Sequence, residues 1–182
     1  SVQKALCSLE TDLIGFNHID ADLEFIKKEL RRPNSDRILY IAQAFREGMS
    51  VDEIFECCKV DQWYLYQIEE IISFEKSVDN SLLKDKVRLR VAKTYGFSDK
   101  MLAYLIACDE EEVYKARKEL GVELEYNEVD TCAAEFKALT PYLYSTTPIS
   151  DIKKEQPKDD AKKVMIIGGG PNRIGQGIEF DY

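Results

Sequence analysis

The sequence predicts a fold that is all-α over residues 1–145, followed by a linker over 146–162 and the start of a truncated α/β domain over 163–182. Residues typical of helix starts and helix ends recur throughout residues 20–121, which predicts a series of helices. Residues 146–162 are rich in threonine, proline and charged residues of both signs, a composition that is typical of linkers. An apolar run at 164–167 then enters a triple glycine, as a buried parallel strand enters a tight loop before a helix.

Capping residues and apolar spacing define each helix in turn. In the first helix, Leu23, Ile26 and Leu30 fall on one face, and Pro33 stops the helix. In chain order, the expected helices are residues 21–32, a helix from Asn34 or Ser35 to Gly48, a short helix opened by a capping box at 50–53, a longer helix capped by Asp61, a helix from Asn80 or Ser81 to Gly96, and helices at 98–107 and 109–120, the last closed by Gly121.

The helix capped by Asp61 carries three aromatic residues, Trp63, Tyr64 and Tyr66. Helical spacing favours Trp63 as a core anchor, and the alternative is that the three aromatic residues form an exposed interaction surface. The expected apolar stripe of this helix comprises Tyr64, Leu65, Ile68, Ile71 and Ile72.

A repeat at an offset of 48 residues relates two helical units of the sequence. The aligned pairs are Ile41 with Leu89, Ala44 with Ala92, Gly48 with Gly96, Ser50 with Ser98, Ile54 with Leu102, Val60 with Cys108, Asp61 with Asp109 and Leu65 with Val113. These pairs favour two similar units packed on each other. The alternative is that unrelated helix–turn–helix segments reuse glycine, serine and aspartate at their ends.

The segment that follows the helices is expected to be extended. Residues 122–129 alternate apolar and polar side chains, which predicts a short exposed strand. Asp130 and Thr131 could then cap a turn of helix through residues 132–136, and Tyr142 and Tyr144 follow.

Charge and composition narrow the function classes. The chain has 34 acidic and 25 basic residues and a net charge of −9, which argues against a general nucleic-acid binder. The one dense basic cluster, at residues 27–32, is interleaved with acidic residues and is expected to be a solvated helix face. No apolar run approaches the roughly 18 residues of a membrane span. A protein without membrane spans is therefore expected.

The five cysteines are odd in number and have no CxxC spacing, which favours a reduced, cytoplasmic protein. The single histidine, His18, has no cysteine at ligand spacing, so no metal site is expected. Residues 1–162 contain no catalytic constellation.

The glycine-rich loop is the only candidate for chemistry in the sequence. Gly168, Gly169, Gly170 and Gly175 could let the backbone approach an anion at a helix N-terminus. Arg173 breaks the dinucleotide-binding fingerprint, and the P-loop lysine is also missing. A tight turn without phosphate contact is therefore at least as well supported as a nucleotide loop.

Six stretches of the sequence carry a family resemblance. The string GGGPNRIGQGIEFDY at 168–182 closely resembles the opening of the second synthetase half of the carbamoyl-phosphate synthetase large chain. VDTCAAEF at 129–136 is similar to the segment leading into that half, and residues 1–11 look like the exit from the first half. Asp36-Arg37-Ile38, AFREG at 44–48 and Trp63 with Glu69-Glu70 fit the helical oligomerisation domain between the halves.

The resemblance implies that residues 1–145 are the oligomerisation domain and 163–182 begin the second, carbamoyl-phosphate-forming ATP-grasp half. The family is an ATP-dependent ligase that uses bicarbonate, ammonia from glutamine and two ATP, with Mg or Mn. It serves arginine and pyrimidine biosynthesis, and a small glutamine-hydrolysing subunit accompanies the large chain. The implied partners of this chain are copies of itself and that subunit, with no nucleic acid and no membrane.

The family's catalytic, ATP-binding and metal-binding residues match nothing in this sequence, so the chain alone is expected to be inactive and to hold no cofactor. By the same resemblance, Arg173, Gly177 and Glu179 would line the passage that carries carbamate between active sites. A serine at position 1 and a stop soon after the glycine loop suggest a piece of a longer protein.

Two alternatives come from other classes of protein. A helix–turn–helix nucleic-acid binder is suggested by residues 96–117, although acidic residues at 109–112 would repel phosphates. A fragment of a dinucleotide-binding enzyme is suggested by the glycine loop and weakened by Arg173.

Overall fold

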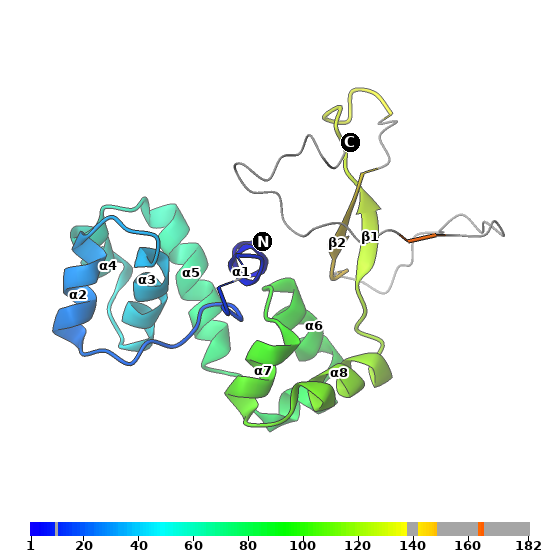
Figure 1. Cartoon of the computed structure of the whole chain (residues 1–182), viewed down its shortest axis with the longest axis horizontal. Coiled ribbons are helices and arrows are strands. Elements are labelled where there is room, and N and C mark those ends of the chain that lie inside the picture. Colours follow the sequence, from blue (N-terminus) through cyan, green and yellow to red (C-terminus); the bar gives the residue numbers. More distant parts are fainter. Residues whose placement is uncertain (10, 138–141, 149–163, 166–182) are drawn as a thin grey trace.

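The computed structural model describes residues 1–9, 11–137, 142–148 and 164–165. Within these residues the chain is mostly helical, as predicted, with eight α-helices, one 3-10 helix and a two-stranded antiparallel sheet. The helices form two groups at opposite ends of the helical body (Figure 1), and each group encloses its own hydrophobic core.

The first group contains the helices α2 (Leu23–Arg31), α3 (Arg37–Arg46), α4 (Val51–Cys58) and α5 (Gln62–Glu75). Helix α3 packs against α2 and α5, while α4 also contacts α2 and α5. Ile26, Ile54 and Leu65 are fully buried at the centre of this group. Burial of these apolar side chains stabilises the helices, which are short for isolated helices in water.

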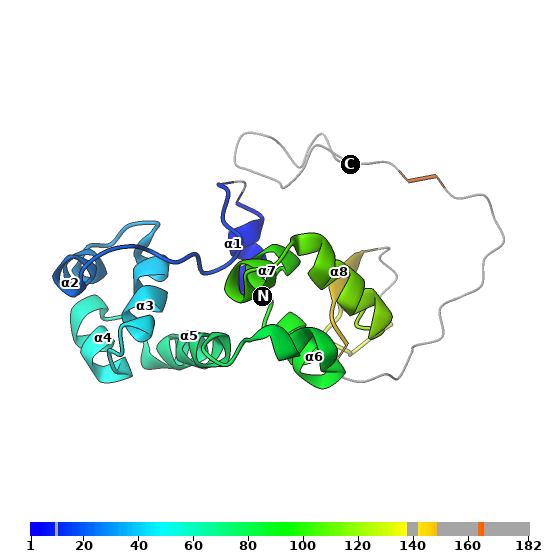
Figure 2. The same ribbon diagram turned by 90° about the horizontal axis from the view of Figure 1, so that it is seen from below.

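The second group contains η1 (Asn80–Lys84), α6 (Lys86–Thr94), α7 (Asp99–Ile106) and α8 (Glu110–Glu119). Its core is built around the fully buried side chains of Leu82, Leu89 and Leu102. Helix α5 runs from the first group toward the second (Figure 2), and Ile71 packs against both cores. The two groups are therefore joined by packing as well as by the chain.

The N-terminal helix α1 (Val2–Cys7) contacts both groups, and its Leu6 side chain belongs to the first hydrophobic core. The side-chain amide of Gln3, which is fully buried, donates to the carbonyl of Tyr95 at 3.1 Å. The amine of Lys4 donates to the carbonyl of Ser145 at 2.7 Å. Helix α1 thereby contacts both the end of α6 and the small sheet.

The two groups share the features that the repeat predicts. Gly48 and Gly96 have left-handed φ values of 87° and 90°. Ser50 caps α4 and Ser98 caps α7, each accepting from the backbone N–H three residues further on. The aligned apolar pairs are buried alike: Ile41 with Leu89, Ala44 with Ala92, Ile54 with Leu102 and Leu65 with Val113.

The helix expected from Asn80 or Ser81 to Gly96 is divided in the structure. The 3-10 helix η1 comes first, and α6 begins anew after Asp85. The Asp85 carboxylate accepts from the backbone N–H groups of Val87 and Arg88, and its extended backbone ends the preceding turn. A capping aspartate therefore splits the predicted helix.

The prediction for Trp63 and Tyr64 is wrong. Trp63 is 62 % exposed, Tyr64 59 % and Tyr66 52 %, so none of the three is a core residue. The buried stripe of α5 is formed by Leu65, Ile68, Ile72 and Glu75. Because each helical residue advances about 100°, Trp63 lies roughly 200° around the helix from Leu65. The alternative of an exposed aromatic surface is the correct one.

The predicted strand is present as β1 (Glu125–Glu128), which pairs antiparallel with β2 (Leu143–Thr146). The expected turn of helix at 132–136 is absent. The Asp130 carboxylate accepts from the N–H groups of Cys132 and Ala134, but Ala133 and Ala134 have positive φ values, which stop helix propagation. Turns therefore follow β1.

The boundary between body, linker and α/β domain falls largely outside the described residues. Among the helices that the structure describes, none is both long and apolar enough to cross a bilayer.

Candidate association surface

The site residues predicted from the glycine-rich segment all lie outside the described residues. They are Gly168, Gly169, Gly170 and Gly175 of the loop, and Arg173, Gly177 and Glu179 of the expected passage. Their roles stay predictions. The described part of the chain offers a different candidate, an open groove between helices of the first group.

This groove has a volume of about 650 Å³ and lies between α3, α5 and the start of α1. Its apolar lining comes from Ile38 and Ile41 of α3 and from Ile68 and Ile71 of α5. Ile41 and Ile68 are buried, and the other two side chains are partly buried. The floor of the groove is therefore continuous with the first hydrophobic core.

Trp63 and Tyr64 line the same groove and project most of their surface into solvent. Their rings meet edge to face, with centroids 5.0 Å apart and an interplanar angle of 88°. Asp61 positions them, because its carboxylate accepts from the Trp63 N–H and begins α5 there. Tyr66, on the same helix, does not line the groove.

One edge of the groove is fixed by a polar contact between the two helical groups. The Tyr95 hydroxyl, at the end of α6, donates to a Glu70 carboxylate oxygen of α5 at 2.6 Å. This hydrogen bond raises the pKa of Tyr95 above its ordinary value of 10.0. The phenol therefore stays protonated and remains a donor at physiological pH.

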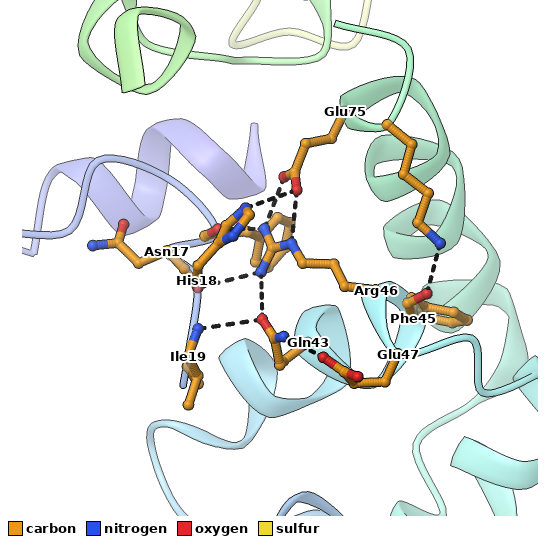
Figure 3. Close-up of polar contacts among 10 residues, drawn as sticks. Asn17, His18, Ile19, Gln43, Phe45, Arg46, Glu47 and Glu75 are labelled. Atoms are coloured by element: carbon orange, nitrogen blue, oxygen red, sulfur yellow. Dashed lines mark hydrogen bonds and ion pairs between the residues drawn. The ribbon is translucent and has the colours of Figure 1, made fainter. Parts of the chain in front are cut away.

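A buried ion pair holds the C-terminal ends of α3 and α5 together (Figure 3). The Arg46 guanidinium donates to both carboxylate oxygens of Glu75, at 2.7 and 2.8 Å. The side chains of Arg46 and Glu75 are only 8 % and 5 % exposed. Arg46 also donates to the carbonyls of Phe16 and Asn17, so it ties the segment before α2 to the two helices.

His18 belongs to this ion-pair cluster. Its Nε2 lies 3.0 Å from a Glu75 carboxylate oxygen (Figure 3), and its ring packs edge-on against Tyr104 of α7 at 5.4 Å. The cluster attaches residues 16–18, which precede α2, to α3 and α5. The described residues contain no group of three or more His, Cys, Asp or Glu side chains that could hold a metal ion.

The second helical group has a comparable ion-pair cluster. Asp99 accepts from Lys93 at 2.7 Å and from Arg117 at 3.2 Å, and all three side chains are nearly buried. Desolvation lowers the pKa of Lys93 below its ordinary value, against the opposing effect of Asp99. A second cavity of about 830 Å³ borders this cluster and the sheet.

Sequence reasoning missed these buried charges, although one signal pointed to Glu75. This residue follows Ile72 by three positions and Ile68 by seven, so it falls on the buried stripe of α5. A carboxylate on an apolar face needs a partner, which the structure provides in Arg46. The partner itself could not be chosen from the sequence.

The nucleic-acid alternative gains nothing from the geometry of α7 and α8. The first turn of α8 would be the start of a recognition helix, and it exposes Glu110, Glu111 and Glu112. Three exposed carboxylates there would repel a phosphate backbone.

The fold and the groove together define a class: a helical module built from two similar units, with an open apolar groove. The chain belongs to the carbamoyl-phosphate synthetase large chain family. The family described as "Carbamoyl-phosphate synthetase large chain, oligomerisation domain" matches residues 1–121. A second, described as "Carbamoyl phosphate synthase preATP-grasp domain", matches residues 160–182.

Curated relatives agree with this assignment. The chain is similar to the carbamoyl phosphate synthase large chains of Campylobacter jejuni and Helicobacter pylori strain 26695, with 52 % identity to each. It is 47 % identical to the arginine-specific, chloroplastic large chain of Arabidopsis thaliana. All of this chain is covered in each comparison. It spans only 18 % of the length of the two bacterial relatives and 16 % of the plant relative.

Proposed function

We propose that the helical body, residues 1–145, mediates self-association of a carbamoyl-phosphate synthetase large chain. The observation that carries this proposal is the open apolar groove bordered by the exposed rings of Trp63 and Tyr64. Aromatic residues are enriched at protein interfaces, where charged residues are depleted. The family description of residues 1–121 as an oligomerisation domain supports the same role.

The activity proposed for the large chain as a whole is that of its relatives by name, a carbamoyl phosphate synthase. This would be an ATP-dependent ligase that consumes bicarbonate, ammonia from glutamine and two ATP in the cytoplasm, with a small glutamine-hydrolysing subunit as partner. ATP and its Mg or Mn would bind outside the present chain. The match of residues 160–182 to a preATP-grasp domain supports this view.

Within the glycine-rich segment, Arg173, Gly177 and Glu179 are proposed to line the passage for carbamate. A glycine leaves the bore open, while a guanidinium and a carboxylate offer hydrogen bonds to a small polar intermediate. The test is made in a full-length large chain, where Gly177→Phe should uncouple ATP hydrolysis from formation of carbamoyl phosphate. Unchanged coupling would remove the passage role.

The present chain is proposed to be inactive by itself. Its purified form should show no ATP hydrolysis that depends on bicarbonate. Bicarbonate-stimulated hydrolysis by the pure chain would contradict the assignment of its role to assembly alone.

The self-association proposal is tested by light scattering over a range of concentrations. The chain is compared with a version ending at Ser150. The two should form the same concentration-dependent oligomer, because the proposed contact lies in the helical body. Association of the longer chain alone would assign the contact to residues after 150, and monomers in both samples would make the body a spacer.

A further inference from the structure

We infer that the groove between α3 and α5 is the contact between two copies of this chain, with Trp63 and Tyr64 of each copy seated in the groove of the other. This inference rests on the proposed function and names the surface and the occupant. Its first support is the groove itself. Ile38, Ile41 and Ile68 form an apolar floor, and the two rings at the border stand more than half exposed.

The second support is electrostatic. Each copy carries a net charge of −9, so two copies repel each other wherever acidic surfaces would meet. Residues 62–68, the first two turns of α5, contain no charged side chain. Among the described side chains that line the groove, Arg37 and Glu70 are the charged ones, and their signs are opposite. Like-charged copies can therefore approach closely at this face.

The third support is self-complementarity. A two-fold contact uses the same patch on both copies, so the patch must present both a projection and a recess. This patch has both, because the paired rings of Trp63 and Tyr64 stand beside a recess of about 650 Å³. Apolar exposure beside a recess in a mostly polar surface is typical of a protein contact.

The rigidity of the groove favours a preformed contact. The floor belongs to α3 and α5, which the Arg46–Glu75 ion pair holds together, and the Tyr95–Glu70 hydrogen bond fixes one edge. Association therefore requires little ordering of the backbone, which lowers its entropic cost.

Trp63 is the single tryptophan of the chain, so its fluorescence reports on the contact directly. Light scattering and tryptophan emission are recorded on the same samples over the same range of concentrations. The emission maximum should move to shorter wavelength along the same curve as the increase in mass, because the indole loses contact with water as dimers form.

Two glutamate variants on the same helix form a matched pair. Tyr64→Glu places a charge in the groove of each copy and should raise the dimer dissociation constant at least about tenfold. Tyr66→Glu makes the same change on a residue of similar exposure that does not line the groove, and it should leave the dissociation constant unchanged. Both positions are exposed, and circular dichroism checks that both variants stay folded.

The outcomes separate this inference from the proposed function. A chain that stays monomeric at all concentrations contradicts both. If the chain associates with no change in Trp63 emission, and if the Tyr64→Glu variant has the same dissociation constant as the wild type, the chain self-associates through another face. That result overturns the inference and leaves the proposed function standing. Emission already at short wavelength in the dilute monomer means that the groove is filled within one chain, which also overturns it.

Discussion

Arg46 connects α3, α5 and the segment before α2 through one side chain. Its guanidinium donates to both oxygens of Glu75 and to backbone carbonyls of the segment before α2. A bidentate charge-assisted contact fixes the distance and the angle between α3 and α5. An ammonium group is a point charge without a planar pair of parallel N–H groups, so it could not fix both. The floor of the groove is built on these two helices.

Replacement of Arg46 by methionine should lower the free energy of unfolding by about 3–5 kcal/mol, because Glu75 would be left buried without its cation. Urea denaturation measures this loss. Arg46→Lys keeps the positive charge but loses the paired N–H donors of the guanidinium. Its stability should therefore lie between those of the methionine variant and the wild type. A loss below about 1 kcal/mol for Arg46→Met would mean that water or His18 replaces the guanidinium.

Glu53 makes the capping box of α4 sensitive to acid. Its carboxylate accepts from both the backbone N–H and the hydroxyl of Ser50, each at 2.8 Å. The backbone hydrogen bond from Ser50 is the main cause of a pKa below the ordinary glutamate value of 4.5. A lowered pKa in the folded state stabilises the fold above 4.5, and this stabilisation disappears as the pH falls through the folded-state pKa.

The pH dependence is tested with Glu53→Gln, which retains a side-chain acceptor but does not titrate. The stability difference between wild type and variant should be largest above pH 4.5 and should decrease in more acidic solution. Urea denaturation across the pH range provides the data. A difference that is constant with pH would show that the hydrogen bonds do not depend on ionisation.

At the scale of elements, the repeated turns explain how two similar helical units arise from one pattern. In each copy a glycine with positive φ ends one helix, a serine begins the next, and that helix ends at a left-handed residue, Lys59 or Ala107. The copies are not identical, since Asp61 caps α5 through its side chain and Asp109 makes no side-chain capping bond to α8.

The paired glycines give a direct comparison of backbone strain and steric space. A Cβ added at Gly48 has no neighbour within 4 Å, so Gly48→Ala should cost only the left-handed strain of about 1–2 kcal/mol. A Cβ added at Gly96 would lie 3.3 Å from the Cβ of Gln3, so Gly96→Ala should cost more.

Thermal and urea denaturation of both alanine variants test this order. Gly48→Asn serves as the control, because asparagine tolerates left-handed backbone better than alanine does. Equal costs at the two positions would mean that helix α1 shifts freely away from Gly96.

At the scale of the whole molecule, the two cores are expected to unfold together. Ile71 packs against both cores, and the Ser98 hydroxyl of the second group donates to the carbonyl of Ile14 at 2.7 Å. The segment between α1 and α2 thus contacts both groups, since Arg46 of the first group holds Phe16 and Asn17.

Leu102→Ala in the second core tests this coupling. Removal of the fully buried leucine should cost about 2–5 kcal/mol. Native-state hydrogen exchange, read by mass spectrometry, should become faster in α3–α5 as well as in α7, because a shared unfolding step would expose both groups. Faster exchange confined to the second group would show that the cores unfold independently.

The sequence by itself determined most of the helices, the glycine and serine turns, a short strand within residues 122–129 and the family. These features depend on hydrogen bonds within a few residues or on strings of adjacent residues, so they can be predicted from short segments of the sequence. The capping box of Ser50 and Glu53 is an example, because both partners lie in one turn. Even here, Asp85 divided a helix that the apolar spacing had predicted as one.

Only the tertiary structure decided what each helix face meets. Arg46 and Glu75 lie 29 residues apart, and β2 was not expected as the partner of β1. Trp63 was predicted inside and lies outside, because the packing of α3 and α4 on α5 buries the face of Leu65 and leaves the opposite side to solvent. Local propensity sets where a helix begins and ends, whereas long-range packing of side chains decides which of its faces is buried and which remains free to bind.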